Sequence, residues 1–210
     1  MAQDILPSYT WNRDTARYRN TETGKFVARR DIIGLLETQV NSAERRLGEL
    51  TTAMHEGRLS PSTWQVTMRD ELRRLHSAQS ALGVGGWDRM DFRAWGRVGG
   101  LLQADYERMT NLARAVQAGE VTLPQALQRV NGYVNAARRG FFESDRDAAR
   151  ATGRTYEERR RLSSSEHCPT CLDLAAMSWQ PFDTLPIPGN GATECGGYDK
   201  CVLERREVKA

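Results

Sequence analysis

Four cysteines near the C-terminus are the residues of this 210-residue chain best suited to chemistry. They form a C-x2-C pair, Cys168 and Cys171, and a C-x5-C pair, Cys195 and Cys201, with 23 residues between the pairs. Two thiolates from one tight turn can hold a single ion, and a second pair can complete a tetrahedral zinc site. The second pair is wider than the roughly two to four intervening residues usual in such sites. Because four thiolates leave no open coordination position, the spacing predicts a structural zinc ion rather than a catalytic one.

Other states of these cysteines stay open. Disulfides require an oxidising compartment, and residues 1–7 lack the positive and apolar regions of a secretion signal. A redox-active pair requires a βαβ context, and buried free thiols require a core, neither of which a short coil-rich segment provides. We therefore favour zinc, with His167 and Asp199 as candidate substitute ligands. Because His167 directly precedes Cys168, a supporting or exposed place is favoured for it.

The elements that must position these cysteines are mostly helical. Apolar residues spaced three and four apart predict four helices, over about 31–57, 61–82, 88–118 and 122–152. A pattern of Ala-apolar-x-x-Gly-x-apolar-Ser/Thr occurs at 53–60 and again at 115–122. Each copy joins a glycine C-cap to a hydroxyl N-cap, so the pattern predicts two helical hairpins with similar turns.

Aromatic residues near the N-terminus predict a different kind of element. Residues 1–30 read as an extended arm with a small hairpin around Gly24. Trp11, Tyr18 and Phe26 would otherwise remain in water, so we expect them to dock on the helical body or on a neighbouring molecule.

Charge is unevenly distributed along the chain, whose formal net charge is +3 with 39% hydrophobic residues. Basic residues outnumber acidic ones in 1–30 and 121–165, whereas acidic residues predominate in 166–210. No run approaches the roughly 18 apolar residues of a membrane span, which excludes an integral membrane protein. We predict a mainly α fold in three parts: an extended N-terminal arm (1–30), an elongated helical bundle (31–165) and a small coil-rich zinc-binding module (166–210).

The C-terminal segment resembles a known module at three stretches of sequence. These are Cys168-Pro-Thr-Cys171-Leu-Asp-Leu-Ala175, Trp179-Gln-Pro with Thr184-Leu-Pro-Ile-Pro-Gly-Asn-Gly191, and Cys201-Val-Leu-Glu204. The pattern is similar to the C-terminal module of tailed-bacteriophage minor head (head morphogenesis) proteins. Tyr18-Arg-Asn-x-x-Thr-Gly24-Lys-Phe-Val27 also resembles an arm found in phage structural proteins. The family often ends in Asn-Cys-Arg-Cys, whereas here Asp199 stands where the family has a cysteine.

The resemblance implies a structural protein of the phage virion, made in the host cytoplasm. It implies a low copy number near the portal vertex and a role in head assembly or in connector or DNA retention. Portal proteins, capsid proteins or both would be its partners, in a symmetric assembly with several copies and no membrane contact.

Arginines form a second candidate site, for weak non-specific contact with packaged DNA. They are Arg138, Arg139, Arg146, Arg150, Arg159, Arg160 and Arg161. Such a stripe could follow a phosphate backbone, although a solvated helix face followed by a basic linker has the same pattern. A zinc-containing DNA-binding or regulatory protein using this helix is the alternative function. The chain lacks phosphate-loop, serine-triad and metalloprotease motifs, so we do not expect an enzyme.

Overall fold

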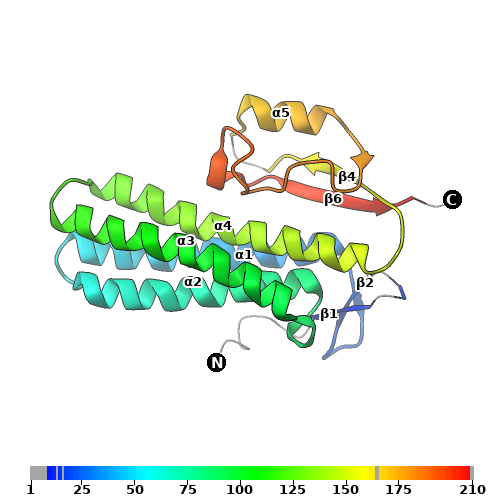
Figure 1. Cartoon of the computed structure of the whole chain (residues 1–210), viewed down its shortest axis with the longest axis horizontal. Helices are drawn as coiled ribbons and strands as arrows, with labels where there is room; N and C mark the ends of the chain where they lie inside the picture. The colour runs from blue at the N-terminus through cyan, green and yellow to red at the C-terminus, as the bar shows by residue number, and fades with distance from the viewer. Residues whose placement is uncertain (1–8, 13, 16, 164–165, 209–210) are drawn as a thin grey trace.

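The computed structural model describes residues 9–12, 14–15, 17–163 and 166–208. Four long helices form an antiparallel bundle (Figure 1): α1 (Arg29–His55), α2 (Pro61–Val84), α3 (Phe92–Gln117) and α4 (Leu123–Arg150). The predicted mainly helical fold is therefore confirmed. The third helix begins later than expected, because Trp87–Arg89 form a short 3-10 turn (η2) and Asp91 caps α3 by accepting the Ala94 N–H at 2.8 Å. None of the described helices is both long and apolar enough to cross a bilayer.

The two predicted helical hairpins close with the same backbone bonds. Gly57 and Gly119 both adopt a left-handed conformation, with φ of 73° and 69°. The residue after each glycine donates its N–H five residues back, from Arg58 to Ala53 at 2.8 Å and from Glu120 to Ala115 at 2.9 Å. The repeated sequence pattern thus encodes one turn geometry, used twice.

The N-terminal arm is a small antiparallel sheet rather than a loose extension. Its strands, in the order β1-β2-β3, are β1 (Tyr9–Asn12), β2 (Arg17–Asn20) and β3 (Phe26–Val27). Trp11 and Tyr18 are buried against each other, and the Tyr18 hydroxyl donates to the Leu82 carbonyl at 3.1 Å. The expected docking is therefore confirmed for these two rings, whereas Phe26 remains 51% exposed, with the Arg17 guanidinium 5.9 Å from its ring centroid. Residues 1–8, 13 and 16 of the predicted arm lie outside the described residues.

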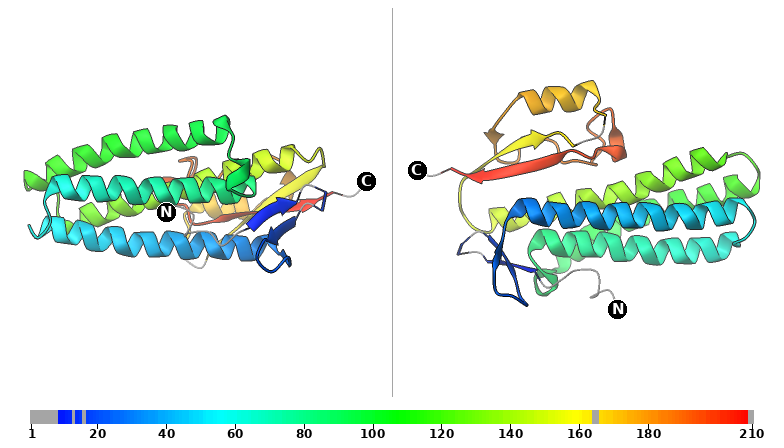
Figure 2. Two further views of the ribbon diagram at one scale, coloured as in Figure 1. Left: turned by 90° about the horizontal axis from the view of Figure 1, so that it is seen from below. Right: turned by 180° about the vertical axis from the view of Figure 1, so that it is seen from behind.

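A second sheet, in the order β5-β4-β6, forms the C-terminal part of the molecule with one short helix. Its elements are β4 (Tyr156–Arg161), α5 (Pro169–Ala176), β5 (Gln180–Pro181), a 3-10 turn η3 (Gly196–Tyr198) and β6 (Val202–Glu207). Figures 1 and 2 show this sheet lying between α5 and the bundle, with α4 beneath it. We call residues 156–208 the C-terminal module.

Strand β4 is the main departure from the expected organisation. Residues 159–161, for which the sequence allows either phosphate contact or a basic linker, pair antiparallel with β6, with Arg161 opposite Val202. Alternate β4 residues, Tyr156, Glu158 and Arg160, are buried, which is the period of a strand with one inward face. The sheet therefore joins segments on both sides of the expected boundary at residue 165, and the module is less coil-rich than predicted.

Helices α2 and α4 cross closely at the centre of the bundle. A Cβ on Gly83 would lie 2.4 Å from the Phe141 carbonyl oxygen and 2.7 Å from the Ser144 Cβ. On the other helix, a Cβ on Gly140 would lie 3.0 Å from the Ser80 hydroxyl. Glycine at these positions lets the two backbones approach, and this contact fixes where the outer face of α4 lies.

We predict that Gly83→Ala lowers the free energy of unfolding by about 1–3 kcal/mol, because the added methyl group meets backbone that cannot move aside. Urea denaturation at neutral pH measures the change. Gly99→Ala is the matched control, since a Cβ there meets nothing within 4 Å. The control should be neutral or stabilising by up to about 1 kcal/mol, as alanine favours helix. Equal stability of the Gly83 variant and wild type would contradict the close crossing.

Candidate metal centre

Two turns and one strand end bring the cysteines together. Cys168 is the N-cap of α5, and the Cys171 N–H donates to its carbonyl at 3.0 Å in the first helical turn, with Pro169 at the first helical position. Cys195 immediately precedes η3, and Cys201 immediately precedes β6. The first turn of α5 therefore positions Cys168 and Cys171 relative to each other. Cys195 and Cys201 are brought to them by the tertiary fold of the module.

The sulfur atoms lie at distances that suit one metal ion. The Sγ atoms of Cys171 and Cys195 are 3.9 Å apart, whereas zinc with bonds of about 2.3 Å would place its tetrahedral sulfurs about 3.8 Å apart. The ligand atoms of Cys168, Cys171 and Cys195 all lie within 4.8 Å of one another, and so do those of Cys171, Asp199 and Cys201. Cys171 belongs to both groups, and all four cysteines are free thiols. The cysteine cluster predicted from the sequence is therefore present, and its donors are compatible with a metal.

Burial makes three of the four thiols hard to ionise by themselves. It raises the pKa of Cys171 to about 11 and that of Cys195 to about 12, and it also raises the pKa of Cys201. Cys168 differs, because a hydrogen bond from Cys195 lowers its pKa to about 7. A divalent cation would displace the thiol protons and relieve this crowding of sulfur atoms.

Asp199 and Arg160 form a buried pair behind the cysteines. Asp199 is 1% exposed and forms an ion pair with Arg160, whose side chain is fully buried. The Asp199 Oδ1 accepts the Cys201 N–H at 3.1 Å and lies 3.9 Å from the Cys171 sulfur. The Thr193 hydroxyl donates to the other carboxylate oxygen at 3.3 Å. With these partners, Asp199 is placed to orient Cys201 and to hold the Arg160 guanidinium close to the sulfur atoms.

The other candidate substitute, His167, is directed elsewhere. Its Nε2 bonds the Ser163 carbonyl oxygen at 2.9 Å. Neither of the two groups of potential ligands in the described chain contains it. Of the two substitutes considered from sequence, only Asp199 lies at the cluster.

Arginines predicted to contact nucleic acid are instead bound to carboxylates of this chain. Three of them, Arg138, Arg146 and Arg160, are buried. The pairs are Arg138–Glu37, Arg139–Glu143, Arg146–Glu158, Arg146–Asp183, Arg150–Asp147, Arg150–Asp183, Arg159–Glu204, Arg160–Asp199 and Arg161–Glu204. The structure therefore does not gather the seven guanidinium groups into one exposed stripe.

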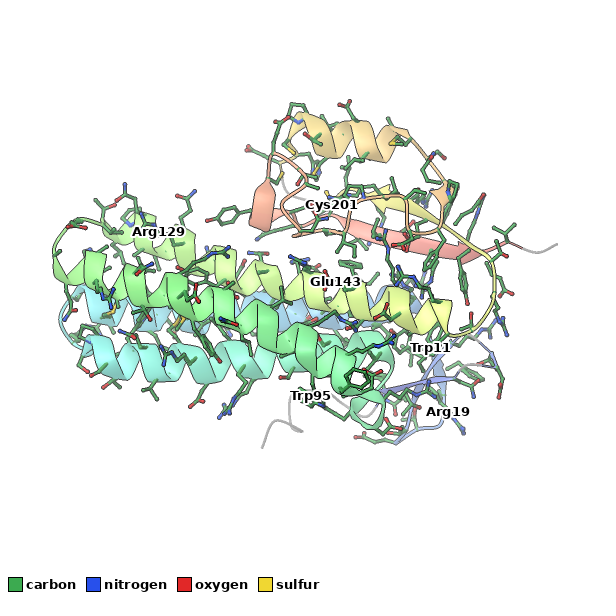
Figure 3. All side chains as sticks on the ribbon, viewed as in Figure 1. Trp11, Arg19, Trp95, Arg129, Glu143 and Cys201 are labelled. Carbon is green, nitrogen blue, oxygen red and sulfur yellow. The ribbon has the colours of Figure 1, made fainter. Side chains whose placement is uncertain are left out.

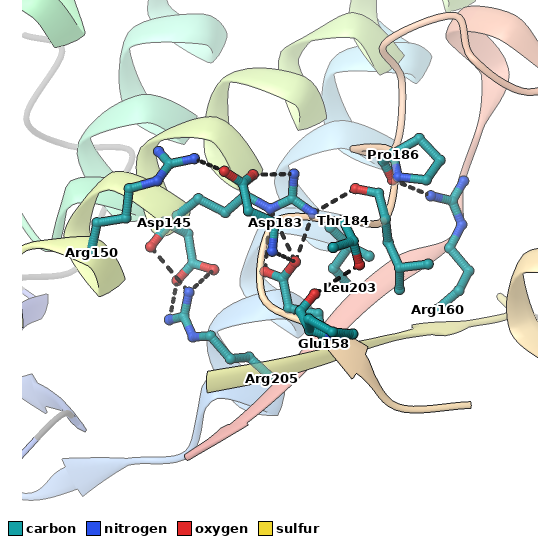
Figure 4. A network of polar contacts seen from close by, with 12 residues as sticks. Asp145, Arg150, Glu158, Arg160, Asp183, Thr184, Pro186, Leu203 and Arg205 are labelled. Carbon is teal, nitrogen blue, oxygen red and sulfur yellow. Dashed lines mark hydrogen bonds and ion pairs between the residues drawn. The ribbon is translucent and has the colours of Figure 1, made fainter. Parts of the chain in front are cut away.

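Adjacent residues on α4 fasten the module to the bundle (Figure 4). Asp145 is 2% exposed and accepts from Arg29 at 2.7 Å and from Arg205 of β6 at 3.0 Å. Arg146 donates to Glu158 of β4 and to the Leu185 carbonyl, both at 2.6 Å. One turn of α4 thus binds both long strands of the module.

The sequence did not predict this ion-pair network or the place of Arg160 beside the cysteine cluster. The partners are too far apart in the chain to be matched from sequence, since Arg160 and Asp199 are 39 residues apart. The sequence of β4 offers no apolar alternation to indicate a strand, because only Tyr156 of its three inward residues is apolar.

Comparisons with known proteins found no match to this chain among protein-family models, curated proteins or solved structures. The functional argument therefore depends on the chain's own residues and geometry.

We predict that Asp145→Asn removes a stabilising contribution that depends on pH. Burial opposes ionisation of Asp145, but Arg205 and Arg29 outweigh it and hold the pKa of the carboxyl below its usual value of 3.8. A depressed pKa stabilises the folded state above about pH 4, and this contribution is lost as the pH falls through the folded-state value. The wild type should therefore be more stable by about 3–5 kcal/mol at neutral pH, and the gap should narrow below about pH 4.

Urea denaturation of both proteins between neutral and acid pH measures this gap. Asp70→Asn is the control, because Asp70 forms an exposed pair with Arg73 and its loss should shift stability little at any pH. A difference between wild type and Asp145→Asn that stays constant down to the acid transition would contradict the prediction.

Proposed function

We propose that the cysteine cluster binds one structural zinc ion. The observation that carries the proposal is the convergence of Cys168, Cys171 and Cys195 within 4.8 Å, with Cys201 beside Cys171. Zinc would tie the N-terminus of α5 to η3 and to the start of β6. Cys201 supplies the fourth thiolate in this proposal, because the oxygens of Asp199 already bind Arg160, Thr193 and the Cys201 N–H.

Purified protein should contain about one zinc per chain by elemental analysis, and a strong chelator should lower the melting temperature. Cys171→Ser and Cys201→Ser should each lose most of the zinc, since each removes a thiolate ligand. His167→Ala and Asp199→Asn should keep it, because neither residue is a ligand in this arrangement. Zinc loss from Asp199→Asn with retention in Cys201→Ser would contradict the proposed ligand set, and absence of zinc from reduced, chelator-free wild type would contradict the site.

We infer further that the chain is a structural protein of a tailed-phage head. The inference rests on the likeness of the 168–204 segment to the C-terminal module of minor head proteins, together with the clustering of the cysteines that belong to that pattern. Portal or capsid proteins would be its partners, and the virion its location. A rigid bundle with a metal-bound module suits a part that docks in a symmetric assembly.

The DNA-binding alternative receives less support. Three of the proposed arginines are buried in ion pairs, and the other four are paired with carboxylates at the surface, so we expect salt-dependent affinity for DNA to be small. We retain non-specific DNA contact only as a secondary property in a packed head.

Particles produced from the genome that encodes this chain provide the test of the head-protein proposal. Quantitative mass spectrometry of purified mature particles should find the chain at a few copies for each portal ring, far below the major capsid protein. Co-expression with the portal protein of the same genome should give a complex on size exclusion. A chain abundant in the lysate but absent from particles would contradict the proposal.

A further inference from the structure

A cavity that is open to solvent lies between α3 and α4, where the bundle meets the C-terminal module. Its volume is about 800 Å³, and its walls come from α3, from α4 and from a loop of the module at 189–191 together with Tyr198. The module closes one side, because the Tyr198 hydroxyl donates to the Gln128 carbonyl of α4 at 2.8 Å. Figure 3 labels Arg129 and Glu143, two lining residues well separated along α4.

Small residues at one-turn spacing keep this space open. Gly100 and Ala104 of α3 line it, as do Gly132 and Ala136 of α4. A Cβ on Gly100 would meet nothing within 4 Å, whereas one on Gly132 would lie 3.2 Å from the Tyr198 hydroxyl. The two helices therefore face each other without filling the space between them with side chains.

Two polar side chains of the cavity wall are placed to bond a ligand, and one of them has a buried oxygen that is unpartnered among the described residues. Tyr133 is 6% exposed and lines the cavity. Asp105 is 2% exposed, and its Oδ2 accepts no hydrogen bond within the described chain, although the fully buried His76 Nε2 lies 3.3 Å away. Burial raises the pKa of Tyr133 to about 12, so its hydroxyl stays protonated and can donate. A buried carboxylate oxygen ordinarily has a hydrogen-bond partner, so the unpartnered Asp105 Oδ2 favours a ligand that supplies a donor.

Four arginines also line the cavity, and two of them have no described carboxylate within close ion-pairing distance. Arg97 and Arg139 are paired with Asp147 and Glu143. In contrast, Arg108 is held only loosely, 3.6 Å from the Asp105 carboxylate, and Arg129 forms no ion pair with any described residue. Both guanidinium groups lie close enough to Tyr133 to act on its ionisation.

We propose that this cavity binds a small organic oxyanion, a phosphate or carboxylate held by Arg108, Arg129 and the Tyr133 hydroxyl. Guanidinium groups match the paired oxygens of either anion. The remainder of the ligand would carry a hydrogen-bond donor to the Asp105 Oδ2. A small molecule fits better than a nucleic-acid backbone, because the Tyr133 hydroxyl is recessed in the wall and the volume falls within the roughly 300–1,000 Å³ of small-molecule sites.

Calorimetry of the full chain at low salt, in a buffer free of oxyanions, tests the proposal with pyrophosphate, AMP and citrate as probes. At least one probe should bind with a dissociation constant of about 1 mM or tighter. Arg129→Gln and Arg108→Gln should each weaken that binding about tenfold, and Tyr133→Phe severalfold, because each removes a donor to the anion. Arg114→Gln is the matched control, since this exposed arginine of α3 lies outside the cavity wall, and its affinity should equal that of wild type.

The probes also identify the source of the anion, because preference for AMP and pyrophosphate indicates a phosphate ligand and preference for citrate a carboxylate. Arg129 is exposed, so its variant should keep the wild-type melting temperature without ligand and yield an interpretable affinity. The proposal is overturned if no probe binds wild type, or if the cavity variants bind as tightly as Arg114→Gln. It is also overturned if a 20-base-pair duplex binds with the same variant dependence while the small anions do not.

Discussion

A short segment of chain buries little apolar surface, and this limit shapes the whole C-terminal module. Only a handful of its hydrophobic side chains are buried, among them Tyr156, Leu185, Val202 and Leu203. A module of this size needs other sources of stability. The module packs on the outer face of α4 and is held there by buried ion pairs. In our proposal, a zinc ion also joins its segments to one another.

Helix α4 connects the bundle to the C-terminal module, because one of its faces packs on α2 and another contacts the module. One face crosses α2 so closely that only glycine fits at Gly83, which makes the helix a rigid support. The other presents Asp145 and Arg146 to the strands of the module. Breaking such a buried pair leaves an isolated charge, so these contacts hold the sheet against α4. Arg160 extends this arrangement to the cysteine cluster, where its guanidinium lies 3.9 Å from the Cys171 sulfur.

Local signals in the sequence account for the helices and for the cysteine cluster. Apolar periodicity and cap residues depend on neighbours within one or two turns, and the spacing of Cys168 and Cys171 is itself a local constraint. Strand β4 could not be recognised in the same way, because its inward face carries Glu158 and Arg160 instead of apolar residues. Their partners are set by tertiary structure, as for Arg138, which pairs with Glu37 from 101 residues away. The cavity beside Tyr133 could not be predicted from the sequence either, because tertiary structure brings together the three distant segments that line it.

X-ray absorption spectroscopy at the zinc edge, on purified full-length protein, tests the central claim most directly. The account predicts a first shell of four sulfur atoms at about 2.3 Å. A shell dominated by nitrogen or oxygen at about 2.0–2.1 Å, or no zinc absorption edge in the reduced protein, would contradict it.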